Sequence, residues 1–120
     1  METREFVNKI TEAIFSKKGS DVKVLDLRKI STIADYFVIC SADSDTQVKA
    51  IADEVDKVLS EEGIKSSRIE GYQALNWILM DYFDVVIHIF KNDTRTYYNL
   101  EKLWGDAPTE ALVDPRESTH

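Results

Sequence analysis

The sequence predicts an α/β (α+β) domain in which helices pack on a mixed, partly antiparallel sheet of about five strands. Its 120 residues fit one compact domain. Hydrophobic residues make up 43% and charged residues 31%, which is the balance of a buried core under a solvated surface. Hydrophobic patterns follow the order helix, strand, strand, helix, strand, strand, strand, helix. Strand patterns without an intervening helix imply antiparallel pairing, so we expect a mixed sheet.

The first half of the chain contains a helix followed by two strands. Apolar residues at helical spacing predict a helix from about Glu2 to Lys18, which Gly19 ends. Alternation over Asp21–Leu27 predicts a strand with at least one buried face. The continuous apolar run Tyr36–Cys40 predicts a central strand covered on both faces.

A second helix is the most strongly predicted element. Ser44 and Gln47 have the spacing of a capping box, in which the serine accepts from the third helical amide and the glutamine reaches back to the cap. An apolar stripe at helical spacing follows as far as Gly63. The chain is therefore expected to be helical between these signals.

The second half of the chain is richer in strands. A short strand is predicted within Ile64–Glu70 and a polar loop over Gly71–Asn76. Two β-rich runs, Trp77–Met80 and Val85–Phe90, are joined by four residues, Asp81–Asp84, and this pattern predicts an antiparallel hairpin.

A last helix and a tail complete the predicted organisation. Asn92 or Asp93 can cap a helix over Thr94–Trp104. Its candidate buried residues are Tyr97, Leu100, Leu103 and Trp104. Prolines and scattered charges follow, so we divide the chain into a domain over residues 1–105 and an acidic C-terminal tail over 106–120 that is expected to be mobile unless a partner holds it.

Charge and composition bound the function. A net charge of −7 repels a phosphate backbone, so no direct nucleic-acid binding is expected; a basic protein partner fits better, and an acidic surface that serves only solubility is the alternative. The charged residues Glu2, Arg4 and Glu5 lack the pattern of a secretion signal, and no apolar run approaches the roughly 20 residues of a membrane span, so we expect neither. The single cysteine, Cys40, is interpreted as a core thiol. We expect a soluble, cytoplasmic protein with no membrane association.

Catalysis receives little support from the residue pattern. Asp35, Asp81 and Asp84 flank strand ends and could hold Mg²⁺, but aspartates more often serve turns, and no glycine-rich phosphate cradle is present. His88 lacks companion ligands for zinc, so a structural or surface role is favoured. We predict no enzyme, no catalytic residue, no metal site and no cofactor. The alternative is a magnesium-dependent nucleotidyltransferase-like enzyme that uses the three aspartates.

Aromatic residues gather in the predicted hairpin and last helix. Large rigid rings dominate binding hot spots, although most aromatics in a small domain belong to its core. The group predicts a protein-binding patch, with a core role as the alternative. Its members are Trp77, Tyr82, Phe83, Tyr97, Tyr98 and Trp104.

Several motifs in order and spacing resemble the Iojap-like ribosomal silencing factors. The likeness covers roughly Phe6 to Trp104. The motifs are Ala34-Asp-Tyr-Phe-Val-Ile-Cys-Ser41, Ser44 opening a helix, Glu70-Gly71, Trp77-Ile-Leu-Met-Asp81, Asp84-Val-Val-Ile-His-Ile-Phe90 and Arg95-x-Tyr-Tyr-x-Leu-Glu-x-Leu-Trp104. In two places the chain departs from the family pattern: Phe83 replaces a common glycine, and Leu75 replaces a small residue.

The resemblance implies a nucleotidyltransferase-like fold without the catalytic signature, and a tendency to form homodimers. It also implies a factor that binds the large ribosomal subunit through universal large-subunit protein fourteen. Such a factor sterically blocks small-subunit joining and represses translation under nutrient limitation. The partner-binding residues that the resemblance implies are Trp77, Ile78, Asp81, His88, Arg95, Tyr98, Glu101 and Trp104, with Asp35 and Glu70 as outer candidates.

Overall fold

A single mixed sheet organises the protein, whose computed structural model describes residues 2–115. The six strands lie in the spatial order β3-β4-β5-β2-β1-β6, and β2 and β5 are parallel while the other neighbours are antiparallel. The strands are β1 (Ser20–Asp26), β2 (Tyr36–Ala42), β3 (Arg68–Glu70), β4 (Trp77–Asp81), β5 (Val85–Lys91) and β6 (Thr109–Leu112). The predicted mixed α+β fold class is confirmed, with one strand more than expected.

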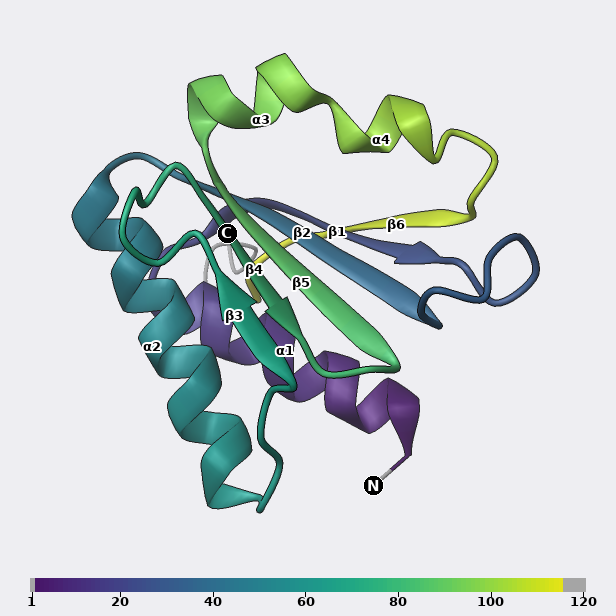
Figure 1. Ribbon diagram of the computed structural model, residues 1–120, viewed down its shortest axis with the longest axis horizontal. Coiled ribbons are helices and arrows are strands. Elements are labelled where there is room, and N and C mark those ends of the chain that lie inside the picture. Colours follow the sequence, from purple (N-terminus) through teal and green to yellow (C-terminus); the bar gives the residue numbers. More distant parts are fainter. Residues whose placement is uncertain (1, 116–120) are drawn as a thin grey trace.

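The helices divide between the two faces of this sheet (Figure 1). The long helices α1 (Thr3–Ser16) and α2 (Asp45–Glu61) cover one face, which we call the helical face. The short helices α3 (Asn92–Tyr98) and α4 (Leu100–Leu103) pass over the other, which we call the open face. In the part of the chain that the structure describes, no helix has the length and apolar character to cross a membrane.

Alternation along the strands builds a separate apolar cluster on each face. The helical face holds the larger one, in which Val38 and Ile87 pack against Ile10 of α1 and Ile51 of α2. The smaller cluster on the open face includes Phe37, Ile39 and Phe90. All seven residues of β2 are buried, which confirms the predicted central strand covered on both faces.

The second helix begins much as predicted. Ser44 Oγ accepts from the backbone N–H of Gln47 at 3.1 Å, as in a capping box. Gln47 Oε1, however, accepts from the N–H of Asp43 at 2.7 Å, one residue before the expected position. The side-chain Nε2 of Gln47 also donates to the backbone carbonyls of Lys17 and Lys18. The cap therefore ties the start of α2 to the end of α1.

The last predicted helix is two helices. Asn99 adopts a left-handed conformation, φ 48° and ψ 58°, and separates α3 from α4. Of the four residues predicted to be buried there, Tyr97 and Leu103 are instead 82% and 72% exposed. Leu100 and Trp104 are half-buried against the cluster on the open face. The break turns part of the predicted apolar stripe toward solvent.

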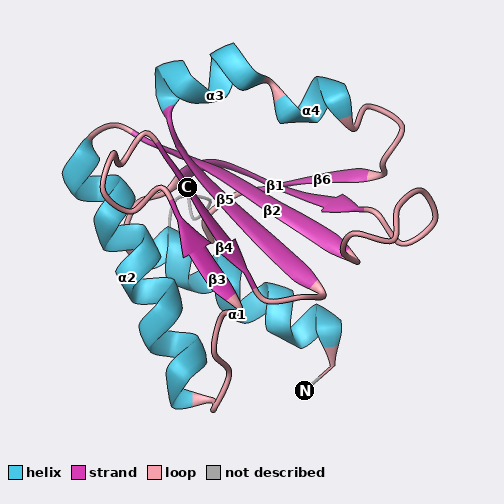
Figure 2. Cartoon of the chain, viewed as in Figure 1, coloured by secondary structure: helices cyan, strands magenta, loops and turns pink. Residues whose placement is uncertain are grey.

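The prediction of a mobile tail over residues 106–120 is wrong for part of that segment. Thr109–Leu112 forms β6, which pairs with β1, and the register places Val22 opposite Leu112. Ala107 and Asp114, on either side of this strand, are buried. Residues 116–120 of the predicted tail lie outside the described residues. The secondary structure in Figure 2 shows β6 as the edge strand beside β1.

Candidate functional site

Trp77 begins β4 and stands on the open face of the sheet. Its ring stacks on Phe90, with centroids 4.8 Å apart and planes at 27°, and it contacts Tyr98 at 4.9 Å. Just before the strand, Gly71 has a φ of 84°, and a Cβ there would collide with the carbonyl oxygen of Trp77. A glycine is thus required for the loop that leads into this tryptophan. The half-buried indole therefore packs between Phe90 and Tyr98 and stays partly exposed.

A buried histidine fixes the indole further. Trp77 Nε1 donates to Nδ1 of His88 at 3.1 Å. His88 is only 3% exposed, and burial lowers its pKa to about 4, so the ring is neutral near pH 7. A neutral imidazole that accepts at Nδ1 carries its proton on Nε2. That Nε2 is buried without a hydrogen-bond partner in the described structure.

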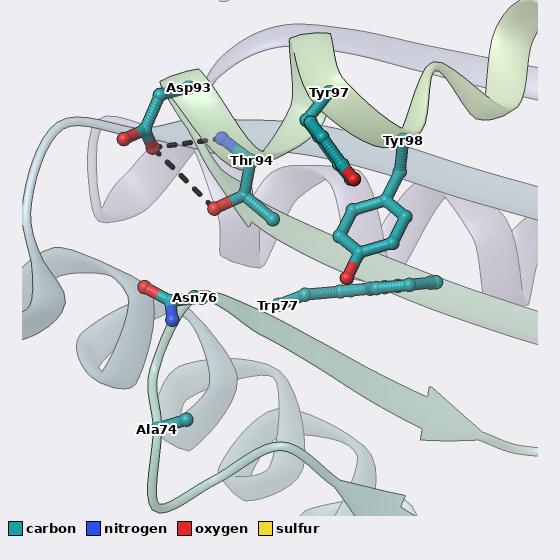
Figure 3. Close-up of a pocket in the computed structure, with 7 residues that line it drawn as sticks. All are labelled: Ala74, Asn76, Trp77, Asp93, Thr94, Tyr97 and Tyr98. Atoms are coloured by element: carbon teal, nitrogen blue, oxygen red, sulfur yellow. Dashed lines mark hydrogen bonds between the residues drawn. The ribbon is translucent and has the colours of Figure 1, made fainter.

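A pocket of about 530 Å³ opens between α3 and the loop before β4 (Figure 3). Trp77 lies on one side, and Tyr98 stands above it from the end of α3. Tyr98 is 51% exposed, and its neighbour Tyr97 packs edge-on against it at 5.1 Å. The lining residues are Ala74, Asn76, Trp77, Asp93, Thr94, Tyr97 and Tyr98. Its walls are mainly aromatic, with the amide of Asn76 and the carboxylate of Asp93 as polar groups, and such a lining suits a protein side chain.

Three of the predicted partner-binding residues are buried. Ile78 is fully buried on the helical face, because alternation along β4 turns it away from Trp77. His88 lies beneath Trp77, and Arg95 is 6% exposed in a network of hydrogen bonds and ion pairs. These residues are core or supporting groups in this structure. Direct partner contact was therefore the wrong expectation for Ile78.

The remaining candidates reach the surface in two groups. Trp77, Tyr98 and Trp104 lie on the open face, and Trp104 contacts Phe37 at 5.7 Å. Glu101 is half-buried beside Arg95 at 3.2 Å. The structure thus brings the aromatic candidates together on one side of the sheet. We call Trp77, Tyr98 and Trp104 the aromatic surface.

Acidic candidates lie at the free edge and at the other end of the strands. Arg68 of β3 lies 3.6 Å from Glu70 and 3.7 Å from Asp81. Asp81 also accepts at 2.9 Å from the N–H of Phe83. The backbone N–H of Asp35 donates to the carbonyl of Asp84, so these two residues meet through the main chain. Within residues 2–115, no three side chains of the His, Cys, Asp and Glu types gather as a metal-binding group.

Sequence reasoning missed several residues of the site. Leu79 is half-buried on the open face, and period-two alternation from Trp77 would have placed it there. Leu103 is exposed on α4, although it was expected inside. Asn76 and Asp93 line the pocket only because the loop and α3 approach each other, which no local pattern indicates.

Comparison with known proteins gives one family. The family model described as "Ribosomal silencing factor during starvation" matches residues 1–120. A protein named ribosomal silencing factor RsfS from Halalkalibacterium halodurans is 49% identical over 112 residues, which cover 93% of this chain and 96% of that protein. Its namesake from Bacillus subtilis is 45% identical and covers 93% of this chain and 95% of its own length.

Plant and structural relatives extend this likeness. The chloroplastic protein Iojap of Zea mays is 31% identical over 114 residues, 94% of this chain but 50% of that protein. A crystal structure of a Bacillus halodurans protein superposes with a TM-score of 0.81 at 45% identity, over 91% of this chain and 99% of that one. A crystal structure from Chromobacterium violaceum gives a TM-score of 0.86 at 34% identity, with 95% of each chain covered.

Proposed function

The chain belongs to the ribosomal silencing factor family, and from this premise we propose that it binds the large ribosomal subunit through universal large-subunit protein fourteen. The bound domain keeps the small subunit from joining and so represses translation when nutrients are limiting. This places its work in the cytoplasm. Its regulatory effect needs no bond to be made or broken, so we infer a binding protein rather than an enzyme.

The aromatic surface is the observation that supports this proposal. Trp77 and Tyr98 offer large rigid rings at a partly open face, and such rings supply binding energy with little loss of conformational entropy. Trp77 is already held by His88 and Phe90, so little further ordering is needed when a partner arrives. The aromatic surface is therefore largely pre-organised for binding a partner.

Charge supports a basic partner. The chain carries 22 acidic and 15 basic residues, a net charge of −7. Glu70 is exposed at the β3 edge of the same sheet, on the strand next to that of Trp77. Electrostatic attraction between this acidic protein and a basic partner accelerates their association, and salt weakens the attraction.

Steric exclusion follows from the size of the domain. Its radius of gyration is 13.3 Å, and its principal extents are 38, 34 and 34 Å. A body of these dimensions on the joining face of the large subunit fills volume that the small subunit needs. The block on subunit joining then lasts as long as the factor stays bound. The residues of the aromatic surface set this time, because they determine the dissociation rate.

Co-sedimentation with purified large and small subunits tests the proposal. We expect the wild type to pellet with large subunits and to block joining, and Trp77→Ala to weaken binding by about 30-fold, the loss of a hot-spot residue. Tyr72→Ala is the matched control, because its ring lies against α2, where it hydrogen-bonds Asp53 and faces Lys49.

Two results would count against the proposal. No pelleting of the wild type with large subunits at low salt would overturn it. Thermal stabilisation by a nucleotide with Mg²⁺ would point instead to the enzyme alternative, because a ligand selective for the folded state raises its stability. Sedimentation of the protein alone measures whether it forms the homodimer that the family resemblance implies.

A further inference from the structure

Helices α3 and α4 place two of the three rings of the aromatic surface, Tyr98 and Trp104, but are weakly anchored by apolar contacts. Among the residues of α3 only Arg95 is buried, and none of the residues of α4 is. By contrast, α1 buries six of its residues against the sheet. Half-buried Leu100 and Trp104 add some apolar contact with the open face. The position of α3 and α4 must therefore depend strongly on what Arg95 contacts.

The Arg95 guanidinium connects four elements of the fold. Its Nη1 donates to the carbonyl oxygen of Asp21 in β1 at 2.6 Å and to Oγ of Ser41 in β2 at 2.8 Å. Its Nη2 donates to Oε2 of Glu101 in α4 at 3.2 Å and lies 3.6 Å from a carboxylate oxygen of Asp21. Each of these bonds crosses between α3 and another element. One side chain thereby fastens both short helices to the sheet.

The break at Asn99 is what allows the Arg95–Glu101 pair. In a continuous helix, residues six apart are rotated by about 240° and separated by about 9 Å along the axis, so their side chains face different directions. The left-handed Asn99 ends α3 and redirects the chain, and Glu101 then folds back to Arg95. Lys23 Nζ of β1 lies 3.8 Å from the same Glu101 oxygen and adds a second positive charge.

The two fastened helices hold the rings of the surface. Tyr98 ends α3, three residues after Arg95, and lies over Trp77 at 4.9 Å. Trp104 follows α4, three residues after Glu101, and rests on Phe37 at 5.7 Å. The separation between Tyr98 and Trp104 is thus set by the same interactions that place the helices.

We propose that Arg95 is the positioning residue of the aromatic surface. Through its contacts with Glu101, Ser41 and Asp21, it holds Tyr98 and Trp104 in the positions that a partner binds. It acts from below and makes no contact with the partner. The inference rests on the proposed function, because it assigns a role within the same docking site. It replaces the expectation that Arg95 is itself a contact residue.

Tryptophan fluorescence can follow this positioning directly. The chain has two tryptophans, so a Trp104→Phe background leaves Trp77 as the sole reporter beneath Tyr98. In that background, we expect Arg95→Ala to raise acrylamide quenching of Trp77 by about twofold, as Tyr98 loses its fixed place over the indole. Arg95→Lys keeps the charge but not the fork of donors and should restore the low quenching only in part.

Binding to large subunits is measured separately, in the chain with both tryptophans. We expect Arg95→Ala to bind about tenfold more weakly, because two interface side chains must then be ordered during binding. Arg28→Ala is the matched control, since it removes an exposed arginine that pairs with Asp26 at 2.7 Å and lies over Tyr36, a member of the cluster on the helical face. It should leave both quenching and binding unchanged.

Several outcomes would overturn the inference. A folded Arg95→Ala with wild-type quenching and binding would refute it, and raised quenching with unchanged binding would remove its role in docking. If Arg95→Ala does not fold, Glu101→Ala decides, because that exchange removes the half-buried acceptor through which Arg95 holds α4, and unchanged quenching would then refute the inference. If the wild type fails to bind large subunits, the proposed function fails, while the quenching series still tests the positioning.

Discussion

Trp77 and His88 are joined diagonally across the antiparallel β4–β5 pair, indole N–H to imidazole Nδ1, at 3.1 Å. The residue directly opposite Trp77 is Phe90, and the residue opposite His88 is Leu79. The hydrogen bond therefore restricts rotation of the indole ring. Phe90 stacks on the face of that ring, with the two ring centroids 4.8 Å apart. The hydrogen bond requires a neutral imidazole, because a protonated ring has no acceptor.

The first prediction concerns acid. Burial lowers the pKa of His88 to about 4, below its usual value, so the unfolded chain binds more protons than the folded one between pH 4 and pH 6.5. The stability that His88 contributes is fully present above about pH 6.5 and is lost as the pH falls to about 4, a change of about 3 kcal/mol. Urea unfolding of the wild type and of His88→Gln across this range should show it.

His88→Gln keeps an acceptor for the indole and removes the titration. Carboxylates titrate in both proteins, so the difference between the two unfolding free energies isolates the histidine. A difference that stays constant from pH 7 to pH 4 would contradict a depressed His88 pKa.

The second prediction concerns the hairpin turn. Phe83 has a φ of 69° and is 71% exposed, so its side chain gives up little burial while its backbone is strained. Phe83→Gly should raise the free energy of unfolding by about 1 kcal/mol, the relief of left-handed strain less the added freedom of the unfolded chain. Chemical denaturation measures the change.

Leu75→Gly provides the contrast for that prediction. Leu75 has a similar φ of 60°, but its side chain packs against the cluster on the helical face. Lost burial should offset the relieved strain, so we expect no gain in stability there. Equal stabilisation by both glycines would show that packing at Leu75 contributes little.

The third prediction concerns thiol reactivity. Cys40 is fully buried in β2, and burial raises the pKa of its thiol to about 12. Labelling with a disulfide reagent near pH 8 should therefore be slow in the native protein and rapid in denaturant. The labelling rate should follow the population of open molecules, and immediate labelling under native conditions would contradict the buried position.

The fourth prediction concerns association with the ribosome. Glu70→Gln removes one exposed charge beside the aromatic surface, and Glu61→Gln removes one at the end of α2, on the helical face. At low salt the first should slow association with large subunits by about twofold, and the second should have a smaller effect. Stopped-flow measurements at low and high salt compare them, and equal effects would place the partner elsewhere.

Local sequence patterns were sufficient to predict an element where its burial and its intrinsic propensity agree. The continuous apolar run of β2 and the capped, amphipathic α2 were placed almost to the residue, because both signals are contained within the segment itself. The sheet was predicted with about five strands because β6 contains only Ala111 and Leu112 as apolar residues. Its pairing depends on the free edge of β1, which lies far away in the sequence.

The site shows the same limit in its details. Trp77 and Tyr98 were recognised by residue type, and alternation along β4 would also have removed Ile78 from the predicted contacts. The break at Asn99 could not be predicted from helical periodicity, because the Arg95–Glu101 pair that accompanies it forms only in the folded chain. A continuous helix through this position buries the wrong residues, because Tyr97 and Leu103, which it was predicted to bury, are exposed.

The unequal anchoring of the two faces has a consequence for hydrogen exchange. The amides of β2 and β5 lie under α1 and α2 and should exchange with deuterium only when the whole molecule unfolds. Those of α3 and α4 rest mainly on one ionic and hydrogen-bonded network, so they should exchange through local openings of much lower free energy. The segment that carries Tyr98 and Trp104 would then form a small cooperative unit of its own, which opens and recloses on an otherwise intact sheet that keeps Trp77 in place.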